Sequence, residues 1–277
     1  MWLPWDYALG LAAVLAVIAG VARQRTDRRS ELVAAVAAEA TIVALLYTLW
    51  QLAGRLSVIN IEGAYDRADQ LWDLERALFL PDEAAVQGWL LPHELWVQAS
   101  NIYYAGAHVP GMGIFLVWMF FRHRDRYRPW RNVLAALTGA CLLIQLVPVA
   151  PPRFIDRFGI VDTGIEYGQS VYASFGSTAA GQLQAMPSIH VAWAMLIALA
   201  LWPLGGWARW MGVAHAVLTN YVVVVTGNHY WLDGVVAAVL LVGLVPIERW
   251  VRDHLVGRVR LADMGEPVDA VVAAVGE

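Results

Sequence analysis

The stretch QAMPSIHVAWAMLIALALWPL, from Gln184 to Leu204, decides the fold class. It places a proline, a serine and a histidine directly before about fifteen apolar residues, a pattern typical of a helix that enters a membrane. A histidine where hydrocarbon begins is costly, because an ionisable side chain loses its water there. The stretch therefore predicts a helix embedded in a membrane, and the histidine at its start requires an explanation in terms of structure or function.

The rest of the chain repeats this apolar character. Of its 277 residues, 59% are hydrophobic and only 15% are charged, with a mean hydropathy of +0.53, which argues against an ordinary soluble domain. The sequence predicts an all-α fold, a polytopic membrane helix bundle of about seven transmembrane helices. The apolar runs that support this lie at 5–22, 32–54, 96–121, 132–149, 187–204, 208–226 and 230–248.

One domain accounts for these runs. Residues 1–260 are predicted to form a single transmembrane helical domain with its catalytic half at 130–250, and residues 261–277 a disordered cytoplasmic tail. The first run is interpreted as a retained helix, because its arginines follow it instead of preceding it. Cys141, the single cysteine, falls inside the fourth run and is expected to be a buried, inert thiol.

The basic residues predict an orientation in the cell membrane. All nineteen are arginines, and they cluster at 23–29 (four), 122–131 (five), 209 (one) and 249–260 (four), with five elsewhere. Because arginine-rich connections stay in the cytoplasm, the amino terminus is expected outside and the carboxyl terminus inside. The connections 55–95 and 150–187 then face the extracytoplasmic side.

Each outer connection has its own expected structure. The stretch AYDRADQLWDLERALFL, residues 64–80, has apolar residues at helical spacing within an acidic segment. Two interpretations stay open: an amphipathic helix in the outer membrane interface, where Trp72, Trp89 and Trp96 would suit, or a loop helix packed on the other outer connection. Residues 150–187, rich in Gly, Ser and Tyr, predict an ordered loop.

Two histidines fall at the outer ends of their predicted helices. His190 follows Pro187 and Ser188, where proline fits a first helical turn and serine can cap it. The free amides of such a turn form a ready anion site. His229 precedes Asp233 by four residues, so on a helix the carboxylate can accept from one ring nitrogen and leave the other free as a nucleophile.

The same side chains could also play simpler roles. Each histidine alone could be an interfacial residue satisfied by water or backbone. His190, His229 and Asp233 could be three metal ligands, but that leaves the anion-ready turn unexplained. A haem is disfavoured because both histidines lie at the same edge, and we expect neither a metal nor another cofactor.

A cation is available to hold an anion beside them. In VPVAPPRFIDRFG, residues 147–159, two prolines fix the chain just before Arg153. The guanidinium fork binds phosphate oxygens bidentately, so phosphate contact is preferred for Arg153 over a plain interfacial role. For Arg157 the interfacial role is preferred.

These residues resemble the type 2 phosphatidic acid phosphatase superfamily, and within it the inositol phosphorylceramide synthase-like branch. The resemblance is carried by AMPSIHVAW (185–193), by GNHYWLDG (227–234) and more loosely by APPRF (150–154). It implies that His229 is the nucleophile, Asp233 its orienting carboxylate and His190 the general acid. It also implies that Arg153, Ser188 and Asn228 hold the phosphate.

The chain departs from the superfamily pattern in its cations. A first motif beginning with lysine is impossible without any lysine, and Val223 stands where the third motif has arginine six residues before the nucleophile. The synthase-like branch also tends to lack both cations. That branch directs attention to NIYYAGAHVPG, where Asn101, Tyr104 and His108 share one helical face and either line the pocket or bond neighbouring helices.

The resemblance implies a metal-independent membrane enzyme that acts on a lipid phosphate or phospholipid through a phosphohistidine at the extracytoplasmic face. Hydrolysis is preferred, and transfer of a phospho-headgroup to an alcohol acceptor, such as inositol or a lipid, is the alternative. A non-catalytic lipid-binding or transport protein is the alternative of another class, although the chain lacks the repeats typical of transporters. Membrane lipids and a water or alcohol acceptor are the expected partners, and nucleic acid is not.

Overall fold

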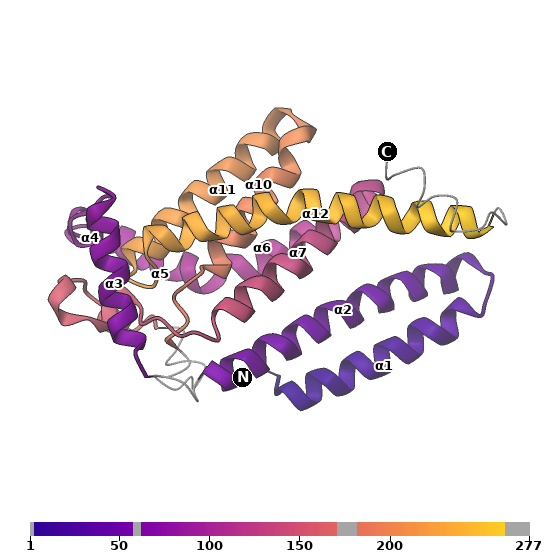
Figure 1. Cartoon of the computed structure of the whole chain (residues 1–277), viewed down its shortest axis with the longest axis horizontal. Coiled ribbons are helices and arrows are strands. Elements are labelled where there is room, and N and C mark those ends of the chain that lie inside the picture. Colours follow the sequence, from indigo (N-terminus) through magenta and orange to yellow (C-terminus); the bar gives the residue numbers. More distant parts are fainter. Residues whose placement is uncertain (1–2, 58–61, 171–181, 264–277) are drawn as a thin grey trace, which may run out of the picture.

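The fold is a bundle of helices, as expected (Figure 1). The computed structural model describes residues 3–57, 62–170 and 182–263, and within them no strand occurs beyond one isolated bridge, Val149 to Gln184. The all-α polytopic prediction is confirmed. The helices are α1 (Trp5–Arg23), α2 (Arg28–Ser57), α3 (Ala64–Ala77), α4 (Glu83–Leu90), α5 (Glu94–Gly106), α6 (His108–Arg122), α7 (Arg124–Ile144), α8 (Thr163–Glu166), α10 (Ile189–Leu201), α11 (Gly206–Val225) and α12 (Trp231–Asp263), with short 3₁₀ turns η2 (Pro152–Phe154), η3 (Asp156–Phe158) and η5 (Trp202–Leu204).

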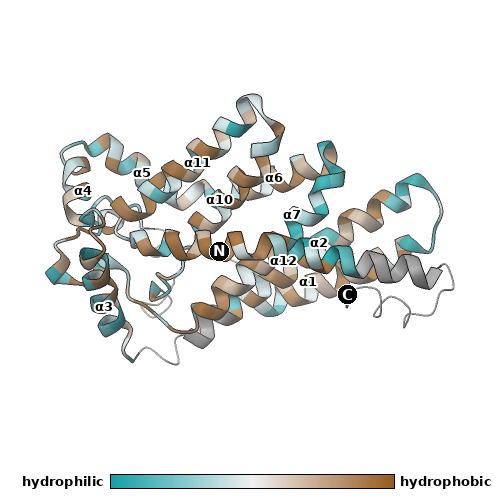
Figure 2. Cartoon of the chain, turned by 45° about the horizontal axis from the view of Figure 1, so that its top comes forward, coloured by the Kyte–Doolittle hydropathy of each residue, from teal (hydrophilic) through white to brown (hydrophobic). Residues whose placement is uncertain are grey.

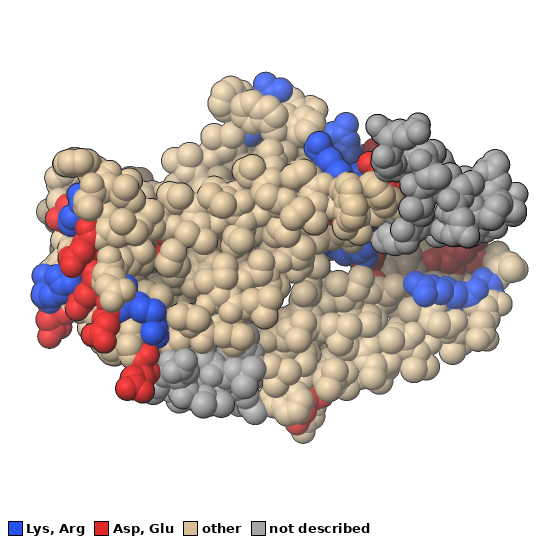
Figure 3. Space-filling view, in the orientation of Figure 1, with Lys and Arg blue, Asp and Glu red and all other residues tan. Residues whose placement is uncertain are grey.

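Apolar side chains cover the middle of the bundle and polar ones its ends. Figure 2 shows the hydropathy of the residues along the helices. On the face in Figure 3 most of the charged side chains gather at two opposite ends, and a few lie at the top and bottom of the view. In the described residues, α1, α2, α11 and α12 are long and apolar enough to cross a membrane, and a fifth span results if α5 and α6 count as one. Helices α7 and α10 overlap the other two expected runs, so seven crossings stay a prediction.

The third expected run is broken. The sequence predicted one helix over 96–121, but α5 and α6 meet at Ala107 with a bend of 52°. Pro110 explains the break, because proline has no N–H to donate and its ring clashes with the carbonyl four residues earlier, that of Gly106. The bend turns the start of α6, with His108, into the bundle, where His108 is 5% exposed.

The short helix α10 lies at the centre of the core. Val191, Ala194 and Leu196 are fully buried, and the core cluster joins α10 to α6, α7 and α12. Cys141 on α7 is buried in the same cluster, as expected. On the remaining side, Gly212 brings α11 so close that an added Cβ would lie 2.8 Å from the Cα of Ala198. Only glycine allows this approach.

The hairpin of α1 and α2 lies at the edge of this core, against which Ala35 of α2 packs. Figure 1 shows the two helices side by side, and buried alanines line both of them. Small side chains let apolar helices approach closely in a membrane. The hairpin is tied to α7 by Glu39, which bonds Arg131 at 2.8 Å and the Tyr127 hydroxyl at 3.0 Å.

The first outer connection packs on the second. Trp72 of α3 stacks on Phe158 with ring centroids 4.0 Å apart, and Arg157 pairs with Asp69 at 2.7 Å. Of the two open interpretations, these contacts support the packed loop helix. The stretch 64–80 forms α3, and a second short helix, α4, follows it. Trp89 and Trp96 at the same end are largely exposed, in keeping with interfacial depth. Residues 171–181 and 264–277, which include most of the predicted tail, lie outside the described residues.

Candidate active site

His190 stands in the first turn of α10. The Ser188 Oγ accepts a hydrogen bond from the Val191 amide at 3.3 Å, so the predicted serine cap is confirmed. Pro187, expected within the first turn, instead precedes the cap, and its carbonyl accepts from the Gln145 side chain at 2.9 Å. The first turn of α10 is therefore stabilised by its own serine cap and by the side chain of Gln145, which directly follows α7.

His229 was predicted on a helix, and this is wrong. It lies in the connection before α12, where the amides of Asn228 and His229 both donate to the Val223 carbonyl. Gly227 turns the chain with a φ of +69°, and its carbonyl accepts from the Arg153 amide at 3.1 Å. A Cβ on Gly227 would lie 3.0 Å from that of Arg153, so glycine is required here by conformation and by space.

The four-residue spacing to Asp233 still brings the two side chains together. The His229 Nδ1 lies 3.0 Å from the Asp233 Oδ2 and 2.6 Å from the Ala185 carbonyl. Both are acceptors, so Nδ1 carries the proton and Nε2 presents a lone pair. The same Oδ2 accepts from the Tyr230 amide at 2.9 Å, which fixes the carboxylate at the start of α12.

The free nitrogen of His229 faces His190. Its Nε2 lies 3.3 Å from the His190 Nδ1, with the ring centroids 5.5 Å apart. The two imidazoles therefore converge although they are 39 residues apart. A phosphorus atom does not fit between nitrogens this close, so a bound phosphate has to approach from the side while the His190 ring turns away.

Burial sets the protonation of His229. The side chain is 5% exposed, and this desolvation lowers the pKa of His229 to about 4, opposed by the bond to the Ala185 carbonyl and assisted by the charge of Arg153. The imidazole is therefore neutral at pH 7. A neutral ring with its Nδ1 proton engaged is the form in which Nε2 can act as a nucleophile.

Arg153 lies in the same site but is already engaged. It is buried on the turn η2, where it donates to the side chains of Asn228 and Gln182 and pairs through Nε with Asp162 at 3.1 Å. Asp162 also caps α8 through its other oxygen. Sequence patterns gave no signal for Asp162, because its position opposite Arg153 depends on the folding of the outer loop.

The polar stripe from α5 to α6 divides in two. The rings of Tyr104 and His108 lie 4.9 Å and 4.5 Å from that of His190, and both nitrogens of His108 are buried without a hydrogen-bond partner among the described residues. Asn101 instead exchanges hydrogen bonds with Thr163 in the outer loop. The two alternatives for the stripe therefore do not exclude each other: Tyr104 and His108 lie against His190, whereas Asn101 both joins α5 to the outer loop and lines the small pocket beside Arg153.

A small pocket of about 20 Å³ opens between this stripe and Arg153. Its volume suits roughly one water molecule, so any larger ligand needs a rearrangement of the loop side. Tyr104, Arg153, Asp162 and Asn228 are among its lining residues.

The alternative of a metal site finds little geometric support. Asp233 faces the Nδ1 of His229, whereas His190 faces its Nε2, so the three groups do not converge on one point. Over residues 3–57, 62–170 and 182–263, no group of three or more His, Cys, Asp or Glu side chains is arranged to hold a metal ion.

Comparison with known proteins gives one match. The family model described as PAP2 superfamily matches residues 69–247, which include most of α3, the outer loop and every residue of the site described above. Neither a curated protein nor a solved structure matches the chain.

Proposed function

The chain belongs to the PAP2 superfamily, whose phosphatase-type chemistry implies a phosphoester substrate, and we propose that it acts on a lipid phosphoester through a phosphohistidine on His229. The observation that carries the proposal is the hydrogen-bonded series from Asp233 through His229 to His190, with distances of 3.0 Å and 3.3 Å. It fixes the proton of His229 on Nδ1 and directs the lone pair of Nε2 toward a second imidazole, that of His190.

The reaction proceeds in two displacements. The His229 Nε2 forms a bond to phosphorus while the bond from phosphorus to the lipid oxygen breaks. His190, which enters this step as the imidazolium, gives a proton to that oxygen and becomes neutral. His190 then accepts a proton from water, whose oxygen attacks phosphorus and releases His229. The ring of His229 becomes cationic while it carries the phosphoryl group, and the Asp233 carboxylate stabilises this charge.

The phosphate charge is balanced by fewer cations than the superfamily pattern provides. Arg153 supplies a guanidinium, and the first-turn amides of α10 supply the positive end of a helix. Ser188 acts by capping that turn, and Asn228 by holding Arg153. His108, buried without a partner among the described residues, offers a further donor to a phosphate oxygen.

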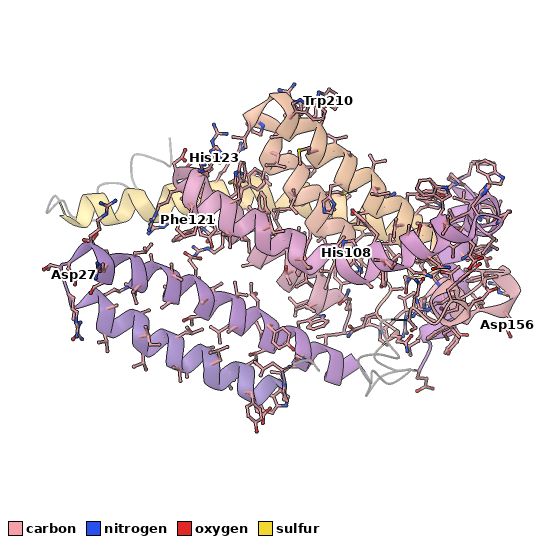
Figure 4. All side chains as sticks on the ribbon, turned by 180° about the vertical axis from the view of Figure 1, so that it is seen from behind. Asp27, His108, Phe121, His123, Asp156 and Trp210 are labelled. Carbon is pink, nitrogen blue, oxygen red and sulfur yellow. The ribbon has the colours of Figure 1, made fainter. Side chains whose placement is uncertain are left out.

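We place the site on the extracytoplasmic side of the cell membrane. Asp27, in the first arginine-rich connection, and Asp156, in the loop that covers the site, lie at opposite ends of the molecule, with His108 between them (Figure 4). The arginine bias assigns the Asp27 end to the cytoplasm, which leaves the amino terminus outside and the carboxyl terminus inside.

Hydrolysis is the preferred outcome, and transfer to an alcohol such as inositol or a lipid is the alternative that the synthase-like branch would favour. Mass spectrometry of products decides between them when purified protein receives a mixture of lipid phosphoesters with and without candidate alcohols. Free phosphate supports hydrolysis, and a new phosphodiester supports transfer. No turnover across a broad panel would instead favour a non-catalytic lipid-binding protein.

Replacing His190 by alanine is expected to lower kcat on an alkyl phosphoester by about 10²- to 10⁴-fold, because the leaving alkoxide then departs without a proton. With p-nitrophenyl phosphate, whose leaving group needs no proton, the rate at which the phosphoenzyme forms should fall far less. Rapid-quench kinetics on both substrates measures the difference. Equal losses on both substrates would contradict the role of general acid.

Changing Asp162 to asparagine is expected to lower KM for an anionic substrate several-fold, because Arg153 then lacks a competing carboxylate while the cap of α8 is kept. Changing Arg153 to methionine should raise KM by about tenfold or more. Steady-state kinetics with phosphatidic acid in mixed micelles tests both. An unchanged KM in both variants would mean that Arg153 does not contact the phosphate.

A further inference from the structure

Two buried acidic side chains lie next to the site without a role in the steps above. Glu75 on α3 and Glu83 on α4 are both fully buried. The cation beside them is Arg76, whose Nη2 lies 2.8 Å from the Glu83 Oε2 and 3.9 Å from the Glu75 Oε2. Asp82 shares the same guanidinium at 3.5 Å. A single positive charge thus serves three carboxyl groups, two of them without access to water.

Each buried carboxyl group has one oxygen left over. The Glu75 Oε2 and the Glu83 Oε1 have no hydrogen-bond partner among the described residues, although both carboxyl groups approach the same Arg76 Nη2. One shared proton satisfies both oxygens and removes one of the two buried negative charges. In keeping with this, burial and then the hydrogen bond and charge of Glu83 raise the pKa of Glu75 to about 9.

The other oxygen of Glu75 reaches the catalytic helix. The Glu75 Oε1 accepts from the Leu232 amide at 2.7 Å, in the first turn of α12. One residue earlier, the Trp231 indole donates to the Pro81 carbonyl at 2.9 Å. One residue later stands Asp233, whose Oδ2 holds both the Tyr230 amide and His229. The region of α3 and α4 therefore binds both residues that directly precede Asp233: Glu75 accepts from the Leu232 amide, and Pro81 accepts from the Trp231 side chain.

We propose that Glu75 is a positioning residue for the catalytic pair. In its protonated form it bridges the Glu83 carboxylate and the Leu232 amide, and it thereby fixes the helical turn from which Asp233 orients His229. The catalytic part of this inference rests on the proposed function, whereas the bridge itself is a property of the fold. Besides Glu83, Arg76 and Asp82, the groups that face Glu75 are Asp233 and Tyr230 at the start of α12.

Glutamine and leucine at position 75 separate this bridge from mere packing. Glutamine can accept from Leu232 and donate to Glu83, so Glu75→Gln should retain the geometry of the protonated acid. Glu75→Leu fills similar space but loses both bonds and leaves the Leu232 amide unpaired. The matched controls are Asp66→Asn and Asp66→Leu, which change an exposed carboxylate of the same helix.

Hydrogen exchange of the full-length protein in detergent micelles tests the bridge without any substrate. The Leu232 amide should be protected equally in wild type and Glu75→Gln, and should exchange about tenfold faster in Glu75→Leu. After correction for intrinsic rates, wild-type protection should fall as the pH rises through about 9, because the bridging proton is then lost. Glu75→Gln should not show this fall. Equal protection in all three proteins, or a glutamine variant that behaves like leucine, would overturn the proposal.

Turnover of phosphatidic acid in mixed micelles tests the consequence for the site. We expect Glu75→Leu to lower kcat by about 10- to 100-fold with little change in KM. The substitution displaces Asp233 but leaves the groups that bind the phosphate in place. Glu75→Gln should stay within about threefold of wild type, as should both Asp66 variants. Full activity of Glu75→Leu would contradict the positioning role. If wild type itself turns over no phosphoester, the proposed function fails, and the exchange result still decides whether the bridge exists.

Discussion

Replacing His229 is expected to lower turnover by at least about 10³-fold, the largest effect of any single change in the chain. In the proposed mechanism Nε2 of His229 forms the bond to phosphorus. Among the described site residues, no other imidazole has the proton on its opposite nitrogen fixed by two acceptors. His229→Asn is the sharper variant than alanine, because the asparagine amide can replace Nδ1 as the donor to Asp233. It keeps the buried carboxylate paired and removes only the nucleophile.

The covalent intermediate gives this prediction a second measurement. With labelled p-nitrophenyl phosphate, the His190→Ala enzyme should still form the phosphoenzyme but hydrolyse it slowly, because the base that activates water is missing. Label should therefore accumulate on protein as an acid-labile phosphoramidate. It should be lost when His229→Asn is added, while thermal unfolding shows that both variants remain folded. Label on another residue, or none during a single turnover, would contradict the covalent route.

The sequence predicted the convergence of the site better than its local structure. Hydropathy located the apolar runs, and the caps and histidines at their outer ends pointed to one edge of the membrane. What the pattern could not show was the backbone: the break at Ala107, and the turn at Gly227 that takes His229 off its helix. Both depend on glycine and proline, whose effect on direction is decided by the packing around them.

The missed residues share a second cause. Asp162 belongs to a loop rich in Gly, Ser and Tyr, and Glu75 to an acidic helix. Each faces the site only through contacts with distant segments. An acidic residue in a polar stretch is usually solvated, so its burial cannot be inferred from neighbours in sequence. Glu75 becomes visible only when its buried, unpaired oxygen is located in three dimensions, and Asp162 only when its pairing with Arg153 is seen.

Changing Asp233 to asparagine is expected to lower kcat by on the order of 10²- to 10⁴-fold while leaving the fold intact. Oδ2 accepts from both Tyr230 and His229, whereas the buried Oδ1 has no hydrogen-bond partner in the part of the chain that the structure describes. An asparagine with its oxygen in the place of Oδ2 keeps both bonds and puts its NH₂ where no donor or acceptor is displaced. The variant therefore removes charge and little else.

The Ala185 carbonyl makes this variant decisive. At 2.6 Å from Nδ1 it can orient the imidazole without any carboxylate, so orientation alone does not require Asp233. What the carbonyl cannot supply is a negative charge to stabilise the ring once Nε2 has bonded to phosphorus. Near-normal kcat in Asp233→Asn, measured with unchanged thermal stability, would mean that the carbonyl suffices and that the carboxylate only caps α12. A large loss confined to kcat would show that charge, and not alignment, is what Asp233 provides.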